Sequence, residues 1–128
     1  MLLLFGMTVA CYMSESQTPQ VDTCNGIDNA QEKESCIDKQ CSSISDAQQK
    51  DECYRKNIRE LASNEMTLVI SVAKKMQDSM IQGAAVSAWV KDNNNTINQQ
   101  QGRQLCELLQ GRDKFYCMRR LSSPHLKR

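Results

Sequence analysis

The feature that most constrains this chain is an internal repeat of seventeen residues that carries a pair of cysteines. The first copy begins at Cys24 and the second at Cys41, and they share Cys, Ile, Ala, Gln, Lys, Cys and Lys at equivalent positions. A weaker third copy begins at Cys106. The three pairs of cysteines are Cys24 and Cys36, Cys41 and Cys53, and Cys106 and Cys117. A repeat of this kind indicates that one small structural unit is used more than once.

Each copy predicts a loop followed by a helix. Asp28 and Ser45 stand where helix N-caps are expected, and Gln31 and Gln48 follow three residues later, which completes a capping box in each copy. The second cysteine of a copy then lies about two turns into the helix. The first cysteine lies four residues before the cap, and four extended residues span roughly 13 Å, comparable to the rise of eight helical residues. A disulfide within one copy can therefore close.

Two disulfide patterns are compatible with this spacing, out of the fifteen that six cysteines allow. In the first pattern the bonds form within copies, as Cys24–Cys36, Cys41–Cys53 and Cys106–Cys117. In the second, the first two copies form a helical hairpin, with bonds Cys36–Cys41 and Cys24–Cys53. The third copy stands far from the others along the chain and has its own pair. Its position favours pairing within copies.

The rest of the chain is also helical in pattern, so we expect an all-α fold. Apolar residues recur at helical spacing through 58–90, which predicts one long amphipathic helix at the centre of the domain. These residues are Ile58, Leu61, Val69, Val72, Met76, Met80 and Ala84. Ser63-Asn64 offers a break in this helix, with Glu65 in the first turn after it. The expected architecture is a small disulfide-stapled helical bundle, with loop–helix modules around the long helix.

Two shorter helices are expected after the long one. Thr96 with Gln99 resembles a further capping box, opening a helix that runs to Gln110, with Gly111 just beyond its end. A last short helix is expected over 113–121. No segment alternates between apolar and polar residues as a half-buried strand does.

The N-terminal segment indicates export. Residues 1–10 are uncharged and mostly apolar, too few to span a bilayer, and Ala10 stands directly before Cys11. This arrangement resembles the lipobox of bacterial lipoprotein signal peptides, although Thr8 stands where that motif prefers Leu and no basic residue precedes the apolar run. The resemblance implies a signal peptide at 1–10, a lipid on Cys11, a tether over 11–23 and an outer-membrane location on the periplasmic or surface face. The alternatives are a soluble periplasmic or secreted protein, and a buried N-terminal segment.

Domain boundaries and redox state follow from this interpretation. With Cys11 lipidated, six cysteines remain, an even number, and an exported chain lies where disulfides form. We therefore expect a helical, disulfide-stabilised domain over 24–122, followed by a C-terminal tail over 123–128.

The second copy of the repeat also resembles a short module of proteobacterial envelope proteins, found for example in the VasI/TagO group of type VI secretion-associated proteins. The residues that match are Cys41, Ile44, Asp46, Cys53 and Tyr54. Lys50 stands where the module often has Arg, and Glu52 replaces its usual small apolar residue. The resemblance covers about fourteen residues per copy, so it implies export and a Cys41–Cys53 bond but no activity.

The sequence offers no arrangement typical of a catalytic or metal site. The cysteine spacings differ from those of structural zinc sites, there is no Cys-x-x-Cys motif, and His125 stands alone in the tail. Met66, Met76 and Met80 fit core packing better than copper binding. We therefore expect no enzyme activity, cofactor or metal. Because 16 basic side chains balance 15 acidic ones, no nucleic-acid partner is expected either.

Binding to another protein is the function that this pattern favours. The chain is expected to be a protein-binding module of an envelope system, as a component of secretion or conjugation, with an unidentified envelope protein as its partner. The alternative is an immunity or inhibitor protein that neutralises a periplasmic toxin or enzyme, and an envelope enzyme or metal carrier is less well supported. Tyr54, Trp89 and Tyr116 are the candidate residues of the partner surface. The sequence leaves the oligomeric state open.

Overall fold

The computed structural model describes residues 24–122, and their regular structure is entirely helical. The helices are α2 (Ala30–Ser42), α3 (Ala47–Arg59), α4 (Met66–Lys74), α5 (Ser79–Asn93), α6 (Gln99–Cys106) and α7 (Gly111–Ser122). A 3-10 turn, η2 (Ser63–Glu65), precedes α4, and another covers residues 24–26 before α2. The prediction of an all-α, disulfide-stapled bundle is confirmed. The predicted signal peptide, lipidated Cys11, tether and tail lie outside the described residues.

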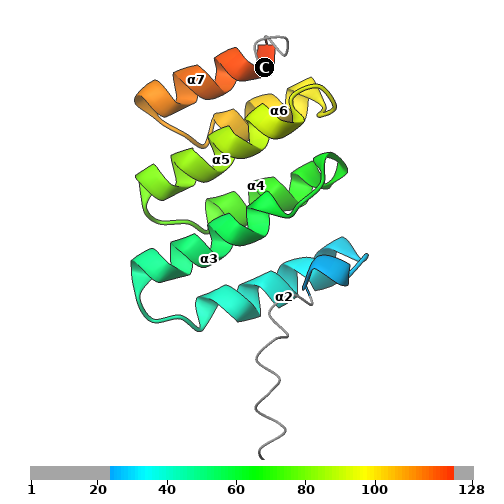
Figure 1. The fold of residues 1–128 in the computed structure, drawn as a ribbon, viewed down its shortest axis with the longest axis vertical. Coiled ribbons are helices and arrows are strands. Elements are labelled where there is room, and N and C mark those ends of the chain that lie inside the picture. The colour runs from blue at the N-terminus through cyan, green and yellow to red at the C-terminus, as the bar shows by residue number, and fades with distance from the viewer. Residues whose placement is uncertain (1–23, 123–128) are drawn as a thin grey trace, which may run out of the picture.

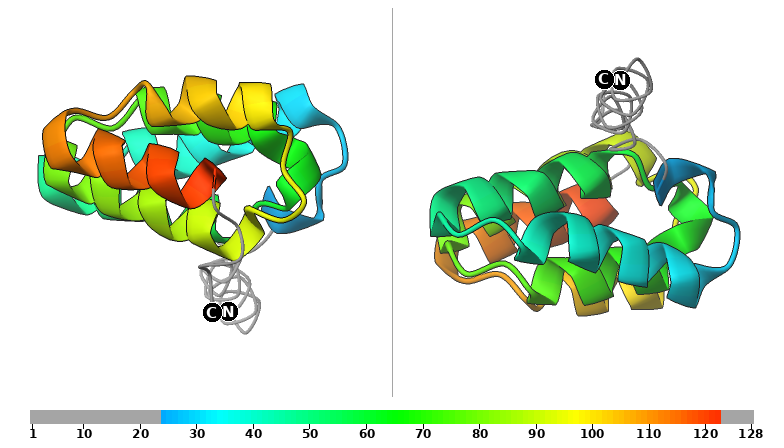
Figure 2. Two further views of the ribbon diagram at one scale, coloured as in Figure 1. Left: turned by 90° about the horizontal axis from the view of Figure 1, so that it is seen from above. Right: turned by 90° about the horizontal axis from the view of Figure 1, so that it is seen from below.

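The helices form three hairpins that stack on one another, α2–α3, α4–α5 and α6–α7 (Figure 1). Helices α2, α4 and α6 make one layer of the stack, and α3, α5 and α7 make the other (Figure 2). Contact between hairpins is most extensive along the second layer, from α3 to α5 and from α5 to α7. A stack in which each hairpin packs mainly on its neighbours is the arrangement of α-solenoids.

The expectation of one long central helix is wrong. The apolar stretch 58–90 is divided among the end of α3, α4 and α5. The break at Ser63-Asn64 falls in η2, as expected, but a second break separates α4 from α5. There the Asp78 carboxylate accepts hydrogen bonds from the backbone N–H groups of Met80 and Ile81, at 2.8 and 3.1 Å, and so caps α5. Asp78 therefore starts a new helix, whereas the periodicity placed it on the surface of a continuing one.

Four turns, those that lead into α2, α3, α5 and α7, share one backbone hydrogen bond, which we call the turn motif; the same kind of bond, from Leu61 to Ile58 at 3.0 Å, also closes the end of α3. In each, an apolar residue donates its N–H to the carbonyl oxygen three positions earlier. The bonds are Ile27 to Cys24 at 3.3 Å, Ile44 to Cys41 at 3.1 Å, Met76 to Ala73 at 3.1 Å, and Leu109 to Cys106 at 3.0 Å. The α4–α5 turn is thus a further copy of the repeat, which its lack of cysteines conceals. Ala73 and Ala85, twelve positions apart and both buried, stand where the other copies have their cysteines.

The three disulfides form within the copies, and the hairpin pattern is not formed. Cys41–Cys53 joins the end of α2 to α3, and Cys106–Cys117 joins the end of α6 to α7. Cys24–Cys36 joins the turn before α2 to α2 itself. The first cysteine of the second and third copies therefore lies in a helix and not, as expected, in a loop. Each of these two bonds connects neighbouring helices of one hairpin.

Three predicted helix caps are displaced by one or two residues. The N-caps of α2 and α3 are Asn29 and Asp46, whose side chains accept from the N–H groups of Glu32 and Gln49; Asp28 and Ser45 precede them. Each copy has two adjacent residues able to cap, and the second of them is used. Likewise α6 is capped by Asn98 and not by Thr96, and it ends at Cys106 and not at Gln110. Gly111, expected beyond a helix end, opens α7 with a positive φ of 54°.

Two acidic side chains connect the first hairpin to the second. Asp51 of α3 is 1% exposed, and its carboxylate accepts the backbone N–H groups of Gln77 and Asp78 in the α4–α5 turn, the shortest bond being 2.6 Å. Glu34 of α2 accepts a hydrogen bond from the hydroxyl of Ser71 on α4, and this hydrogen bond lowers the pKa of the Glu34 carboxyl.

Within residues 24–122, no helix is both long and apolar enough to cross a membrane.

The equivalence of Ala73 and Ala85 to a cysteine pair is testable. In the double variant Ala73→Cys/Ala85→Cys we expect a fourth disulfide, because the same turn motif brings Cys41 and Cys53 together. A loop of this length stabilises the folded state by about 3 kcal/mol in the chain-entropy model. Thiol titration and urea denaturation of the oxidised protein would measure both effects. In the control Ala73→Cys/Ala84→Cys, the second cysteine is on the exposed side of α5 and should stay reduced. Free thiols in the Ala73/Ala85 variant would contradict the equivalence.

Candidate functional site

A hollow lies in the first hairpin, at one end of the stack. It is a pocket of about 720 Å³ between α2 and α3, which we call the end groove. Its apolar floor includes Ile37, Ile44 and Leu61. The view from below shows that no other described helix covers this end of α2 and α3 (Figure 2). Its volume and its mixture of apolar and polar lining are typical of ligand pockets.

The charged side chains at the groove differ in burial and in whether a side chain of opposite charge lies beside them. Lys33 is buried, and its ammonium group lies 2.8 Å from the Glu65 carboxylate. Burial raises the pKa of Glu65, but the hydrogen bonds from Lys33 and from the Ala62 backbone lower it, and the net direction is downward. Lys33 is thus held by an internal partner. Glu52, Lys56 and Glu60 are exposed at the rim. The Glu52 carboxylate lies 3.5 Å from Arg55, and Glu60 accepts a hydrogen bond from the Asn25 amide at 3.2 Å.

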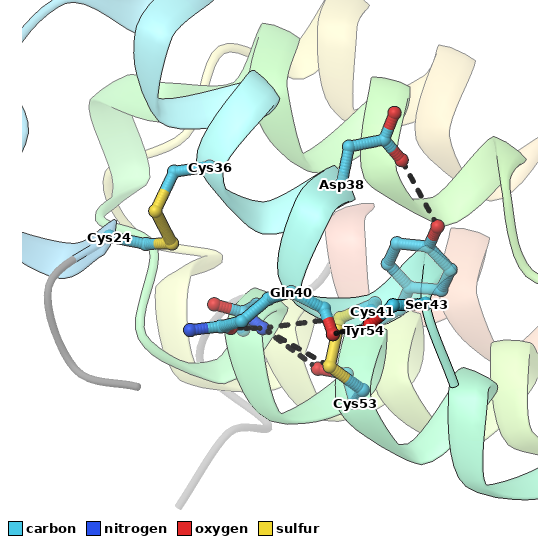
Figure 3. Close-up of a disulfide and its surroundings, with 9 residues drawn as sticks. Cys24, Cys36, Asp38, Gln40, Cys41, Ser43, Cys53 and Tyr54 are labelled. Carbon is cyan, nitrogen blue, oxygen red and sulfur yellow. Dashed lines mark hydrogen bonds between the residues drawn. A yellow bond between two sulfur atoms is a disulfide. The ribbon is translucent and has the colours of Figure 1, made fainter. Parts of the chain in front are cut away.

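Two disulfides hold the walls of the groove in place (Figure 3). Cys24 and Cys53, one from each bond, line the pocket. Next to the second bond, the Asn57 amide donates to the Cys53 carbonyl at 2.9 Å and to the Gln40 side chain at 3.2 Å. These bonds fix α2 against α3. The groove is therefore preformed, so a ligand would not have to order its walls on binding.

Of the three residues predicted to form a partner surface, two are buried in the core. Tyr54 is 3% exposed and its hydroxyl donates to Asp38 at 3.1 Å (Figure 3). Trp89 is also 3% exposed, and its indole N–H donates to the Leu61 carbonyl at 2.9 Å. The prediction is wrong for both, because their rings are packed inside the stack with their polar atoms satisfied internally. Tyr116, on α7, is 44% exposed.

Sequence reasoning missed the end groove, although one signal for it exists. Lys33, Ile37, Gln40 and Ile44 line the groove and follow one another at spacings of four, three and four. Such a stripe marks one face of a helix. The stripe does not stand out in the sequence, because the repeat already explains the neighbouring cysteines without a ligand.

The described residues show little that could hold a metal ion. Between residues 24 and 122, no group of three or more His, Cys, Asp or Glu side chains is arranged as a metal site. The six cysteines of this region are all in disulfides. Met66 and Met76 pack in the core and Met80 is exposed, while His125 lies outside the described residues. Comparison of the chain with protein-family models, curated proteins and solved structures finds no match.

The burial of Tyr54 gives a prediction for alkaline pH. Burial, and then the hydrogen bond to Asp38, raise the pKa of Tyr54 from its ordinary value of 10.0 to about 12. Because the phenol ionises near its ordinary value once the chain unfolds, the folded state loses stability as pH rises above about 10. Ultraviolet difference titration of the native protein should show a tyrosine transition near 12 that is absent in Tyr54→Phe. If Tyr54→Phe leaves every transition in place, Tyr54 is not the buried phenol.

Proposed function

We propose that this chain is an exported lipoprotein, anchored to the outer membrane through Cys11, that binds another protein in the end groove. It would act in an envelope system such as secretion or conjugation. The observation that carries the proposal is the end groove itself, a preformed pocket with an apolar floor and a charged rim at an uncovered end of the stack.

The chemistry of the groove suits a protein side chain or helix. Its floor of Ile37, Ile44 and Leu61 can receive an apolar anchor, and burial of one such side chain is worth about 1.5–3 kcal/mol. Glu52 and Glu60 at the rim favour a partner with basic residues around that anchor. An apolar anchor inside a charged rim is the usual composition of a binding interface.

The cysteines and the N-terminal segment support the location. Three disulfides in a domain of this size are typical of an oxidising compartment. The apolar residues before Ala10-Cys11 fit a lipoprotein signal peptide. The tether would meet the domain at Cys24, which lines the end groove. Thirteen tether residues can extend to about 45 Å, which leaves room for a partner between the groove and the membrane.

The anchor can be tested by replacing Cys11. In Cys11→Ala the lipid acceptor is lost, so the protein should move from the membrane fraction to the soluble periplasm or accumulate unprocessed. Fractionation and immunoblotting measure the change, with Met13→Ala as a control beyond the lipobox. An unchanged membrane fraction for Cys11→Ala would exclude Cys11 as the anchor.

Binding in the groove can be tested by photo-crosslinking in exporting cells. A photoreactive phenylalanine analogue at Lys56, an exposed residue of the groove, should form a discrete protein adduct. The same analogue at Lys91, exposed on α5 and not part of the groove, should form none. Equal labelling from both positions, or no adduct from either, would count against a binding function of the groove.

A further inference from the structure

The repeat defines a row of positions that faces the next hairpin, which we call the stacking ridge. It comprises the positions two before, one after and five after the second cysteine or its equivalent. These residues are Asp51, Tyr54 and Ile58 in α3, Gly83, Val86 and Val90 in α5, and Phe115, Met118 and Ser122 in α7. All six in α3 and α5 are buried. Asp51 binds the α4–α5 turn, and Gly83 lies directly beneath the Asp113 carboxylate of α7.

In α7 the stacking ridge is uncovered and yet apolar. Phe115 is 59% exposed, Met118 is half-buried, and no hairpin follows among the described residues. The last helix of an α-solenoid ordinarily has a polar outer face. Here the Phe115 ring instead packs edge-on against Tyr116, with centroids 5.4 Å apart. The exposed Arg112 lies one helical turn before Tyr116.

The end groove is the complementary surface at the opposite end of the stack. Its residues on α3 include Glu52, Lys56 and Glu60, which lie on the face of the helix opposite Tyr54 and Ile58 of the stacking ridge. No described hairpin lies beyond α2 and α3 on the side away from the second hairpin (Figures 1 and 2). The lining of the groove is partly apolar, and its rim has two acidic side chains, Glu52 and Glu60, and one basic side chain, Lys56. The stack thus has an exposed apolar ridge on α7 at one end and a groove with a partly apolar lining at the other.

The hairpins at the two ends of the stack have net charges of opposite sign. Residues 24–60, the first hairpin, have eight acidic and six basic side chains, a net charge of −2. Residues 99–122, the last hairpin, have two acidic and five basic side chains, a net charge of +3. The two ends therefore attract each other between molecules, although the whole chain has a net charge of only +1.

We infer that the occupant of the end groove is a second copy of this chain. The α7 stacking ridge of one copy seats Phe115 in the groove of the next, and the arginines of α7 meet the glutamates of the rim. This inference rests on the proposed binding function and names its partner. The contact is heterologous, since it joins two different surfaces and leaves a free groove and a free ridge at the ends of each pair. Copies therefore assemble head to tail and continue the stack of hairpins.

Photo-crosslinking of the full chain in exporting cells tests this inference. The photoreactive analogue at Phe115 should yield a product of two copies, with the attachment mapped by mass spectrometry to α2 or α3. The analogue at Met80, which is 78% exposed but not on the ridge, should yield none. Attachment to α7 of the other copy, to residues 12–23, or to a different protein would overturn the inference, as would no product.

The Lys56 analogue separates the two proposals. An adduct of a different protein from Lys56, with no two-copy product from Phe115, would leave the proposed binding function intact and exclude self-assembly. No crosslinked product from either position would exclude both the binding function and self-assembly. A two-copy product from both positions, joining α7 to the first hairpin, is the expected result.

Complementary variants give a second test that does not depend on the crosslinker. Phe115→Asp changes only the stacking ridge of α7, and Glu52→Arg/Glu60→Arg changes only the rim of the end groove. All three side chains are exposed, so the fold should tolerate these substitutions. In cells that express two tagged copies of one variant, co-purification should fall by about tenfold or more relative to wild type. When the two variants are expressed together, an intact ridge meets an intact groove, and pairing should return. Pairing within either variant alone, or none in the mixture, would overturn the head-to-tail contact.

Discussion

The hairpins depend on the turn motif, the backbone hydrogen bond found where α2, α4 and α6 end and the chain turns into α3, α5 and α7. Because the same bond occurs at Cys41, Ala73 and Cys106, the chain reverses in the same way in all three hairpins. This reversal places the second cysteine of each copy, or the equivalent Ala85, beside the first cysteine or Ala73. Two hairpins hold that contact with a disulfide, whereas the middle one relies on small buried alanines between two packed neighbours. Covalent bonds are thus found where a hairpin lacks a neighbour on one side.

The two ends of the stack expose what the middle buries. Each hairpin offers an apolar ridge on one side and receives a ridge on the other, so a stack of any length ends with one unmatched surface of each kind. Neither end is wholly polar: Phe115 is exposed at one, and Ile44 is half-buried in the end groove at the other. The interior of the fold and its candidate binding surfaces therefore have the same chemistry.

Much of the fold could be predicted from sequence because the repeat is local. The all-helical class, the break at Ser63-Asn64 and the partners of the cysteines all follow from patterns within about twenty residues. The division of the apolar stretch 58–90 was not predicted, because its helical periodicity continues through Asp78, the residue whose side chain caps α5. The burial of Trp89 and the end groove were missed for a related reason. Both depend on how hairpins stack, which no single segment specifies.

The carboxylate of Asp51 has a consequence for how the domain folds. The amides of Gln77 and Asp78 belong to the second hairpin, but their acceptor is a side chain of the first. Without α3 these two exposed amides lose a charged acceptor, and a hydrogen bond to a charged group is worth about 1.5–3 kcal/mol. The first hairpin therefore stabilises the turn of the second. The acceptor precedes its donors along the chain, so the stack is suited to ordered growth from the N-terminal end as the polypeptide emerges.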